Sequence, residues 1–378
     1  MVTGSHIPDD RNGLKFYRSQ GEVDKADEGR ILAHHAILNL SAVPAEAATP
    51  DSLDALSAYR ARYVDFFGPA ALDGLTVGVY QHSAVGRDVL CVILAALGAK
   101  PVALGRSERF IPVDTEAPRP EDVALASDWA RESRLDAIVS TDGDADRPLV
   151  ADEAGRFLRG DLVGALTARF LDADAIVTPV TSNSALDRPG LFPKVFRTRV
   201  GSPYVIAGMA EAAAGGAARV VGFEANGGVL LGSDVERGGR RLAALPTRDA
   251  VLPILAVLSA VAEAGTPLSR LAAERNFAIA LSDRLPEVPQ EKTAALIARL
   301  DADDPAFRET AFAAHSGVAA RDSRDGLRLT LGDGNTVHFR ASGNAPELRV
   351  YVETPDQAAA EALLQENLSF AAAQTRTS

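Results

Sequence analysis

Cysteine and aromatic residues are scarce in this chain of 378 residues, and its 39 basic residues are outnumbered by 51 acidic ones. Cys91 is the single cysteine, which excludes an intrachain disulfide and favours a reducing compartment. Its surroundings, "RDVLCVILAAL", are typical of a buried helix face, so we interpret Cys91 as a core residue and not as a nucleophile. Aromatic residues make up 6% and hydrophobic residues 47% of the chain, which predicts globular cores built on Ala, Val and Leu.

The excess of negative charge and the lack of long apolar runs exclude further classes of protein. A formal net charge of −12 argues against a general nucleic-acid binder or a protein of anionic membranes, although local arginines can still bind an anionic substrate. The most apolar segment, "DAVLPILAVLSAVAEAG", contains Pro253 and is shorter than the ~20 residues of a membrane span. No basic segment followed by an apolar one opens the chain, so we expect a soluble cytoplasmic protein.

Strand and helix patterns alternate through the middle of the chain. The segments "LTVGVY", "KPVALG" and "LDAIVS" are typical of strands, and "VLCVILAAL" of a helix that stops at Gly98. A second round places the helix "GSPYVIAGMAEAAAGG" between the strands "ADAIVTPV" and "ARVVGF", with a further strand at "GVLLGS". This order predicts α/β layers with parallel or mixed sheets.

The C-terminal part predicts a different, α+β module. The segment "GLRLTLGDGNTVHFRASG" indicates two antiparallel strands around a Gly-Asp-Gly-Asn turn, and "LRVYVET" indicates a third strand. We expect Thr354 to cap a terminal helix that has Pro355 at its first position and Gln357 closing a capping box.

Three carboxylates occupy alternate positions in "STDGDADRPLVADE". Asp142, Asp144 and Asp146 can point the same way, and oxygen ligands at this density suit Mg²⁺ or Ca²⁺. An EF-hand would use Glu153 at its twelfth position, but Arg147 stands at the sixth, where Gly is needed, and a strand precedes the loop. The alternative is a solvated acidic turn; the crowded carboxylates favour a metal site, with Mg²⁺ as the expected ion.

Two arginines flank a turn of small residues in "HFRASGNAPELRVYV". Arg340 and Arg349 lie on either side of Ser342, Gly343 and Asn344. Backbone N–H groups, a hydroxyl and two planar guanidinium groups can together bind one phosphate. Taken alone, the segment favours a surface hairpin with ordinary charges; together with a metal loop elsewhere in the chain, it favours a phosphate site.

Two further segments contain candidate substrate residues. In "GFEANGGVLLG", Glu224 and Asn226 enter a glycine-rich turn and are suited to bind sugar hydroxyls, with an exposed hairpin turn as the alternative. Arg199 in "TRVGSPYV" precedes a helix and is a candidate for the same pocket. The segment "TGSHIP" contains Ser5, whose hydroxyl is a poor nucleophile without a base or metal; His6 and Lys15 are the nearby groups that can handle its proton.

These four stretches, in this order, resemble the α-D-phosphohexomutase family, which includes phosphomannomutase and phosphoglucomutase. "TGSHIP" is similar to the family's catalytic loop and "DGDADR" to its Asp-Gly-Asp-Gly-Asp-Arg metal loop. "GFEANGG" loosely resembles its sugar loop, and "RASGNAP", followed by the Arg of "LRVYVE", resembles its phosphate loop. The resemblance covers the whole chain, and the metal and phosphate loops are its specific motifs.

The resemblance implies a four-domain enzyme in which three α/β domains supply the catalytic, metal and sugar loops and a smaller domain supplies the phosphate loop. We expect residues 1–70 to be a remnant of domain 1, 71–157 to be domain 2, 158–277 domain 3 and 278–378 domain 4. The implied reaction interconverts hexose 6-phosphate and hexose 1-phosphate through a phosphoserine and a bisphosphate that turns over in the cleft. A hexose 1,6-bisphosphate is the expected activator, and a monomer or weak dimer the expected state.

The resemblance also implies the role of each residue. Phosphorylated Ser5 would share Mg²⁺ with the three aspartates, Arg147 would steady its phosphate, and Lys15 and His6 would assist proton transfer. The sugar hydroxyls would be read by Glu224, with Asn226 in place of the usual Ser. The remaining substrate-binding residues, most of which hold the phosphate that is not reacting, would be Arg199, Arg340, Ser342, Gly343, Asn344 and Arg349.

Several positions depart from the family pattern. Ile7 stands where Asn is usual, Gly228 where phosphomannomutases commonly have His, and Arg199 where Lys is usual. The catalytic loop also comes four residues after Met1, whereas most of a first domain precedes it in the family. We therefore expect that on the order of 100 residues of a normal first domain are missing. We also expect the residues before about 70 to be poorly supported, with Ser5 not firmly held in catalytic position.

Mannose phosphates are the expected substrates, with phosphoglucomutase and phosphoglucosamine mutase activities as alternatives. A different hypothesis is a phosphatase-like phosphotransferase that uses an Asp of "DGDADR" as nucleophile; it predicts that Ser5→Ala retains phosphoryl transfer while Asp142→Ala abolishes it. A third hypothesis is a truncated remnant that binds sugar phosphates without turnover.

Overall fold

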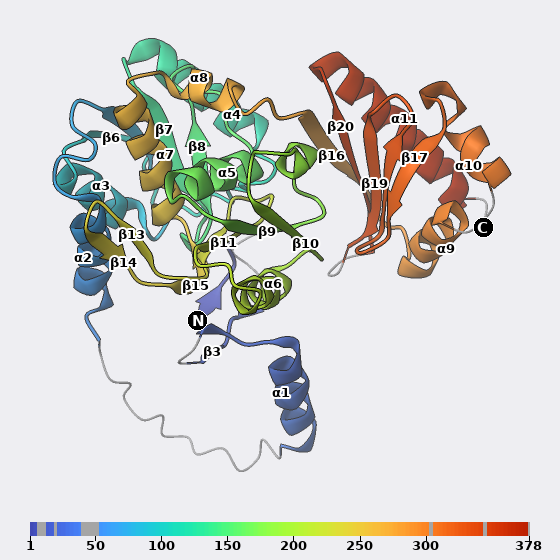
Figure 1. The fold of residues 1–378 in the computed structure, drawn as a ribbon, viewed down its shortest axis with the longest axis horizontal. Helices are drawn as coiled ribbons and strands as arrows, with labels where there is room; N and C mark the ends of the chain where they lie inside the picture. Colours follow the sequence, from blue (N-terminus) through green and yellow to red (C-terminus); the bar gives the residue numbers. More distant parts are fainter. Residues whose placement is uncertain (6–12, 19–20, 39–52, 302–304, 343–345, 377–378) are drawn as a thin grey trace. The chain divides into compact units, whose positions relative to one another are not determined.

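The computed structural model describes residues 1–5, 13–18, 21–38, 53–301, 305–342 and 346–376. The chain divides into two compact units (Figure 1). The first contains Met1–Val177 and Gly201–Glu274, and the second contains Thr178–Val200 and Arg275–Ser378. Within the described parts of the chain, no helix combines the length and the apolar composition of a membrane span.

The first sheet of the first unit has four strands in the order β6 (Lys100–Leu104), β5 (Thr76–Tyr80), β7 (Ala137–Thr141) and β8 (Pro148–Ala151). The first three strands are parallel and β8 is antiparallel to β7. Helices α3 (Arg87–Ala96) and α4 (Pro120–Glu132) form the crossovers between the parallel strands. The predicted strand–helix–strand order of this region is confirmed, and the loop of the three aspartates joins β7 to β8.

A second sheet in the same unit has β9 (Ala175–Pro179), β11 (Val220–Phe223), β12 (Val229–Leu231) and β15 (Leu245–Asp249) as successive neighbours. Strands β9 and β11 are parallel, whereas β12 runs antiparallel to both β11 and β15. The predicted second α/β round is therefore also confirmed, as a mixed sheet.

Helices α5 (Gly160–Phe170) and α6 (Ser202–Ala214) cover opposite faces of β11. A Cβ at Gly222 would lie 2.6 Å from Met209 Sδ of α6, and a Cβ at Gly164 of α5 would lie 2.4 Å from Cγ of Phe223. Since successive residues of a strand face opposite ways, the adjacent Gly222 and Phe223 place one helix on each side. Helix α7 (Val251–Ala264), most of whose side chains are buried, packs beside α5. The remaining elements here are α8 (Leu268–Ala273), β13 (Val235–Arg237) and β14 (Arg240–Leu242).

The second unit contains a five-stranded antiparallel sheet in the order β16 (Ile279–Leu285), β20 (Leu348–Thr354), β19 (Thr336–Ala341), β18 (Leu327–Leu331) and β17 (Val318–Asp322). Its core is apolar and includes Leu329, Phe339 and Val350. The predicted α+β module and its hairpin, now β18 and β19, are confirmed.

Helices line this antiparallel sheet and complete the second unit. Helices α9 (Gln290–Asp301) and α11 (Gln357–Arg376) pack against the sheet and against each other (Figure 1). The other elements of the unit are α10 (Pro305–Ala311), the 3₁₀ helices η2 (Ser184–Asp187) and η3 (Ala313–His315), and β10 (Lys194–Thr198).

The expected cap of the terminal helix is wrong. Helix α11 begins at Gln357, and Asp356 Oδ1 accepts a hydrogen bond of 2.9 Å from the N–H of Ala359, as an N-cap residue does. Thr354 cannot serve as the cap because it is still paired with Ile279 in the sheet.

The first residues of the chain form short hairpins and one exposed helix. Strand β1 (Val2–Thr3) pairs with β2 (Gly13–Leu14), and β3 (Tyr17–Arg18) pairs with β4 (Gly21–Glu22). Helix α1 (Lys25–Ile37) leaves its apolar residues Ile31, Leu32 and Ile37 exposed.

Helix α2 (Ala55–Phe67) is much better supported than the sequence predicts. It buries Tyr63, Phe66 and Phe67, so the expectation of poor support before residue 70 is wrong for this helix. Tyr59 donates a hydrogen bond of 2.6 Å to Asp249 Oδ1 at the end of β15, and the fully buried hydroxyl of Tyr63 donates to Asp249 Oδ2. Two phenols therefore satisfy both oxygens of one buried carboxylate and fix α2 against β15.

We predict that Tyr63→Phe destabilises the first unit, because it leaves Asp249 Oδ2 buried without its donor. A hydrogen bond to a charged group contributes about 2 kcal/mol, or roughly 4–8 °C in the melting temperature of a unit of this size. Differential scanning calorimetry measures the shift. The matched control is Tyr17→Phe, since Tyr17 is 45% exposed and its change should leave the melting temperature within about 2 °C. Equal shifts in the two variants would contradict the role of the Tyr63–Asp249 contact.

Candidate active site

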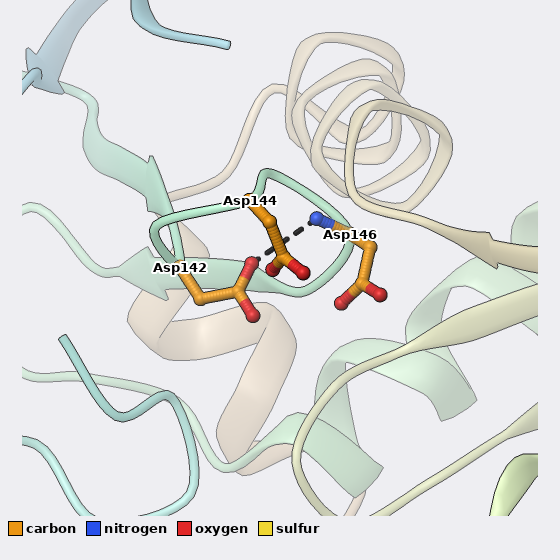
Figure 2. A group of neighbouring side chains, drawn as sticks. All are labelled: Asp142, Asp144 and Asp146. Carbon is orange, nitrogen blue, oxygen red and sulfur yellow. Dashed lines mark hydrogen bonds between the residues drawn. The ribbon is translucent and has the colours of Figure 1, made fainter. Parts of the chain in front are cut away.

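The loop between β7 and β8 brings Asp142, Asp144 and Asp146 together (Figure 2). One carboxylate oxygen from each lies within 4.8 Å of the others, and Asp142 is fully buried. Asp142 also organises the loop, since its Oδ1 accepts hydrogen bonds of 3.1 Å from the N–H groups of Asp146 and Arg147. The alternate spacing in the sequence therefore becomes a compact cluster of carboxylates.

This cluster fits a hard divalent cation. The hydrogen bonds to Asp144 and Asp146 fall on their Oδ2 atoms, whereas Oδ1 of each is buried and has no hydrogen-bond partner among the described residues. Buried carboxylate oxygens without partners are costly unless a cation binds them. The set of oxygen donors, with no nitrogen or sulfur ligand among the three, suits Mg²⁺.

Ser5 lies directly against this cluster. Its Oγ donates a hydrogen bond of 2.8 Å to Asp142 Oδ2, and its backbone N–H donates to Thr3 Oγ1, which in turn donates to Asp144 Oδ2 at 2.6 Å. Gly143 allows this approach, because a Cβ there would come within 2.4 Å of the Ser5 carbonyl oxygen. The expectation that Ser5 is not firmly held is therefore wrong, since both its hydroxyl and its backbone N–H are hydrogen-bonded.

Positive side chains surround the three carboxylates. Lys15 Nζ lies 2.8 Å from both Asp144 Oδ2 and Asp146 Oδ2, and Arg147 Nε lies 4.0 Å from Asp142 Oδ2. The structure thus brings Ser5, Lys15 and Arg147 to one place, as the sequence predicts. His6, the other predicted proton-transfer residue, lies outside the described residues.

The crowded charges shift the pKa values in opposite directions. Burial, reinforced by the carboxylates of Asp146 and Asp144, raises the pKa of Asp142 to about 7. Burial acts in the same sense on Asp144, but hydrogen bonds from Lys15 and Thr3 outweigh it and lower the pKa of that carboxyl. Burial opposes the charge of Lys15, yet its hydrogen bonds to Asp144 and Asp146 raise its pKa. Neighbouring carboxylates with opposite shifts are typical of functional sites.

The loop after β11 places Glu224 and Asn226 in a tight turn. The N–H of Glu224 donates to Gly228 O and the N–H of Gly227 donates to Glu224 O, both at 3.0 Å. Thr115 Oγ1 donates to Asn226 O at 2.7 Å, and Gly160, at the start of α5, packs so closely that a Cβ would clash with the loop backbone. Glu224 is only 4% exposed, so this predicted sugar-binding carboxylate is buried and is not the exposed residue of a plain hairpin turn.

Arg248 is a site residue that the sequence did not single out. It lies on β15, its side chain is 11% exposed, and its guanidinium is 3.2 Å from Asp146 Oδ2 and 3.8 Å from Glu224 Oε2. The available signal was a single arginine in "LPTRDAV", directly before an apolar helix.

The predicted phosphate-binding residues lie in the second unit. Arg340 and Arg349 are directly opposite each other on β19 and β20, and Ser342 follows β19 with its N–H donating to Glu347 O at 2.9 Å. Gly343 and Asn344 lie outside the described residues.

The turn after β17 links Arg340 to the Arg199 loop. Asp325 Oδ1 accepts from Arg340 Nε at 3.1 Å, and its Oδ2 accepts from the N–H of Val200 at 2.8 Å. Arg199 Nε donates to Arg324 O at 3.1 Å. One turn therefore fixes the predicted substrate residues Arg199 and Arg340 within the same unit.

Three family models match successive parts of the chain. Residues 55–155 match domain II of phosphoglucomutase/phosphomannomutase, an α/β/α domain, residues 159–277 match its α/β/α domain III, and residues 287–369 match its C-terminal domain. Together these matches cover most of the sequence and include the acidic loop, the Glu224 turn and the paired arginines.

Relatives of known name cover nearly the whole chain. A phosphomannomutase of Sinorhizobium fredii is 50% identical over 373 residues, which are 98% of this chain and 78% of the relative. A phosphomannomutase of Salmonella muenchen is 43% identical over 357 residues, covering 94% of this chain and 73% of the relative. A phosphoglucosamine mutase of Sorangium cellulosum is 30% identical over 375 residues, covering 94% and 70%.

The chain belongs to the phosphohexomutase family. It is therefore a mutase of the isomerase class that acts on small hexose phosphates. Two solved structures show that the phosphohexomutase fold is shared. A family protein from Burkholderia thailandensis has a TM-score of 0.71 at 21% identity, and the match covers 98% of this chain and 74% of that protein. A phosphomannomutase described as putative from Thermus thermophilus has a TM-score of 0.68 at 23% identity, and the match covers 98% of this chain and 77% of that protein.

For this phosphohexomutase we predict that Gly143→Ala lowers kcat by about 100-fold, because the new Cβ must displace the Ser5 backbone and small misplacements of reacting groups have effects of this size. Steady-state kinetics measures the loss, and circular dichroism checks that the fold is retained. The matched control is Gly29→Ala in α1, where a Cβ meets nothing within 4 Å and kcat should stay within about twofold. An unchanged kcat in Gly143→Ala would contradict the catalytic position of Ser5.

Proposed function

We propose that the protein interconverts mannose 6-phosphate and mannose 1-phosphate through phosphorylated Ser5 and a mannose bisphosphate. The observation that carries the reaction is the contact of Ser5 Oγ with Asp142 Oδ2 inside the three-aspartate cluster. The choice of mannose is supported by the identity to two phosphomannomutases, 50% and 43%.

The residues of the cluster perform the positioning that phosphoryl transfer requires. Phosphoryl transfer depends mainly on in-line placement and on neutralising charge. Asp142, Asp144 and Asp146 would hold Mg²⁺, which when bound would supply much of that neutralisation. The phosphoryl group passes from Ser5 Oγ to the free hydroxyl of the sugar phosphate, and after the bisphosphate turns over, its other phosphoryl group returns to Ser5. Arg147 steadies the transferring group, and we assign the accompanying proton transfers to Lys15 and His6.

The other predicted residues bind the substrate. Glu224 and Asn226 read the sugar hydroxyls, and Arg199 and the phosphate loop hold the phosphate that is not reacting. We assign the metal, sugar and phosphate loops to domains at 71–157, 158–277 and 278–378, with the serine loop in 1–70. Ser5 without its phosphoryl group needs a donor, so hexose 1,6-bisphosphate is the activator. The residues proposed for the phosphate loop are Arg340, Ser342, Gly343, Asn344 and Arg349.

We predict that the chain converts mannose 1-phosphate to mannose 6-phosphate in the presence of Mg²⁺ and a trace of mannose 1,6-bisphosphate. Phosphorus NMR follows the two phosphate signals, with glucose 1-phosphate and glucosamine 1-phosphate in parallel tubes. Mannose 1-phosphate should react fastest. Faster conversion of glucose 1-phosphate or glucosamine 1-phosphate would show that the preferred substrate is not a mannose phosphate. Binding of a sugar phosphate without conversion would favour the third hypothesis, a truncated protein that binds sugar phosphates without turnover.

We predict that Ser5→Ala abolishes this conversion, because it removes the oxygen that carries the phosphoryl group. The matched control is Ser127→Ala in α4, whose hydroxyl donates to Val123 O of the same helix, and its activity should be unchanged. Retained phosphoryl transfer in Ser5→Ala, together with its loss in Asp142→Ala, would favour the phosphatase-like mechanism.

We predict that removing divalent metal with EDTA lowers the rate at least about 100-fold, since the cation offsets the charge of the transferring group. Adding Mg²⁺ in excess should restore the rate, which a stopped assay of mannose 6-phosphate measures. Full activity in EDTA would show that the three aspartates serve another purpose.

A further inference from the structure

Arg248 is a largely buried cation placed between two functional loops. Its guanidinium uses separate nitrogens for its two partners, Nη2 toward Asp146 Oδ2 of the metal loop at 3.2 Å and Nη1 toward Glu224 Oε2 of the sugar loop at 3.8 Å. Its Nε is buried and has no hydrogen-bond partner among the described residues. Removing an arginine from water is costly unless its partners are also charged, and both partners of Arg248 are carboxylates.

Glu224 depends on a nearby cation. The side chain is buried and its Oε2 accepts no hydrogen bond from the described residues. Burial raises the pKa of Glu224. The positive charges of Arg248 and, to a smaller extent, Arg147 lower this pKa, whereas the carboxylates of Glu116 and Glu22 raise it. Arg248 therefore contributes most to keeping Glu224 ionised, and a carboxylate is a stronger acceptor for sugar hydroxyls than a neutral acid.

Gly228 makes room for the arginine. A Cβ at this position would lie 2.8 Å from Cδ and 3.0 Å from Cγ of Arg248, so the aliphatic stem of the arginine lies directly on the sugar loop. The contact between β15 and the loop is thus both apolar, through the stem at Gly228, and ionic, through the guanidinium at Glu224.

The strand that carries Arg248 is fixed on both sides. Thr247 Oγ1 donates to Glu22 Oε1 at 2.9 Å, and Ser202 Oγ donates to the other oxygen of Glu22 at 2.7 Å. On the other side Asp249 accepts from the two tyrosines of α2. Because both neighbours are anchored by hydrogen bonds to other elements, the backbone at Arg248 offers a rigid base for a long side chain.

We propose that Arg248 is a positioning residue that orients the Glu224 carboxylate for the sugar hydroxyls and ties the sugar loop to Asp146 of the metal loop. This inference rests on the proposed function, since it assigns Glu224 to the sugar. Arg248 acts through Glu224, so its loss weakens sugar binding. It affects the chemical step much less, because Asp146 keeps its closer contact with Lys15 at 2.8 Å.

The test replaces the charge and keeps the stem. In Arg248→Met we expect the KM for mannose 1-phosphate, and its Kd measured by calorimetry, to rise about 30-fold, with kcat changed by less than about threefold. The matched control is Arg241→Met on β14, because that arginine is exposed and pairs with Asp234 at the surface; its KM and Kd should not change. Arg248→Lys should give intermediate values, since one ammonium group cannot replace two separate guanidinium nitrogens.

A double-mutant cycle separates positioning from general support of the fold. If Arg248 acts through Glu224, then Arg248→Met should add no more than about twofold to the KM of Glu224→Gln. The pH profile gives an independent readout. Without Arg248 the pKa of Glu224 rises. When the pH is lowered, Glu224 is then protonated earlier, so the KM of Arg248→Met should begin to increase at a higher pH than the KM of the wild type.

The outcomes distinguish this inference from the function on which it rests. A wild-type chain that neither binds nor converts any hexose phosphate would overturn the proposed function and the inference with it. A working wild type with an unchanged KM and Kd in Arg248→Met would overturn the inference alone. Fully additive effects in the double mutant, or a loss confined to kcat, would also overturn it.

Discussion

The electrostatic repulsion among Asp142, Asp144 and Asp146 is the constraint on which the rest of the site depends. Three carboxylates within 4.8 Å of one another are stable only if donors and cations surround them. The first residues of the chain supply many of these, through the hydroxyl of Ser5, the hydroxyl of Thr3 and the ammonium of Lys15. The contacts that compensate the acidic loop are therefore the same contacts that place the candidate nucleophile beside it.

Strand β15 is the second support of the site, and it links parts of the first unit that are far apart in the sequence. Three consecutive residues contact different parts of the unit: Thr247 binds Glu22 of the first hairpins, Arg248 contacts both functional loops, and Asp249 binds the tyrosines of α2. Polar contacts of this kind depend on direction and distance, so a small shift of β15 would weaken its contacts with the sugar loop and with α2 at the same time.

The sequence predicted those parts of the site whose residues are adjacent in the chain. The aspartates, the Glu224 turn and the arginine pair each lie in one short segment, and alternation of strands and helices predicted the sheets that carry them. Arg248 could not be found in this way, because its partners come from two distant loops and the space it fills exists only where Gly228 lacks a side chain. The support of α2 was missed for a related reason: Asp249, which binds its tyrosines, lies on β15, 186 residues after Tyr63 in the sequence. The cap of α11 was misplaced because Thr354 remains paired in the sheet, which local patterns do not show.

The metal loop shows how a close contact can compensate for an unfavourable backbone conformation. The family loop resembled here reads Asp-Gly-Asp-Gly-Asp-Arg, whereas this chain has Ala145 at the second glycine, in the left-handed region with φ of 63°. A residue with a Cβ is about 1 kcal/mol less stable in that region than elsewhere. Two features hold it there. Asp142 Oδ1 accepts hydrogen bonds from the N–H groups of Asp146 and Arg147, the two residues after Ala145. Gly86 leaves room for the methyl group of Ala145, since a Cβ at Gly86 would lie 2.8 Å from the Cβ of Ala145. The loop therefore keeps its shape because Asp142, the residue that contacts Ser5, also determines the backbone around it.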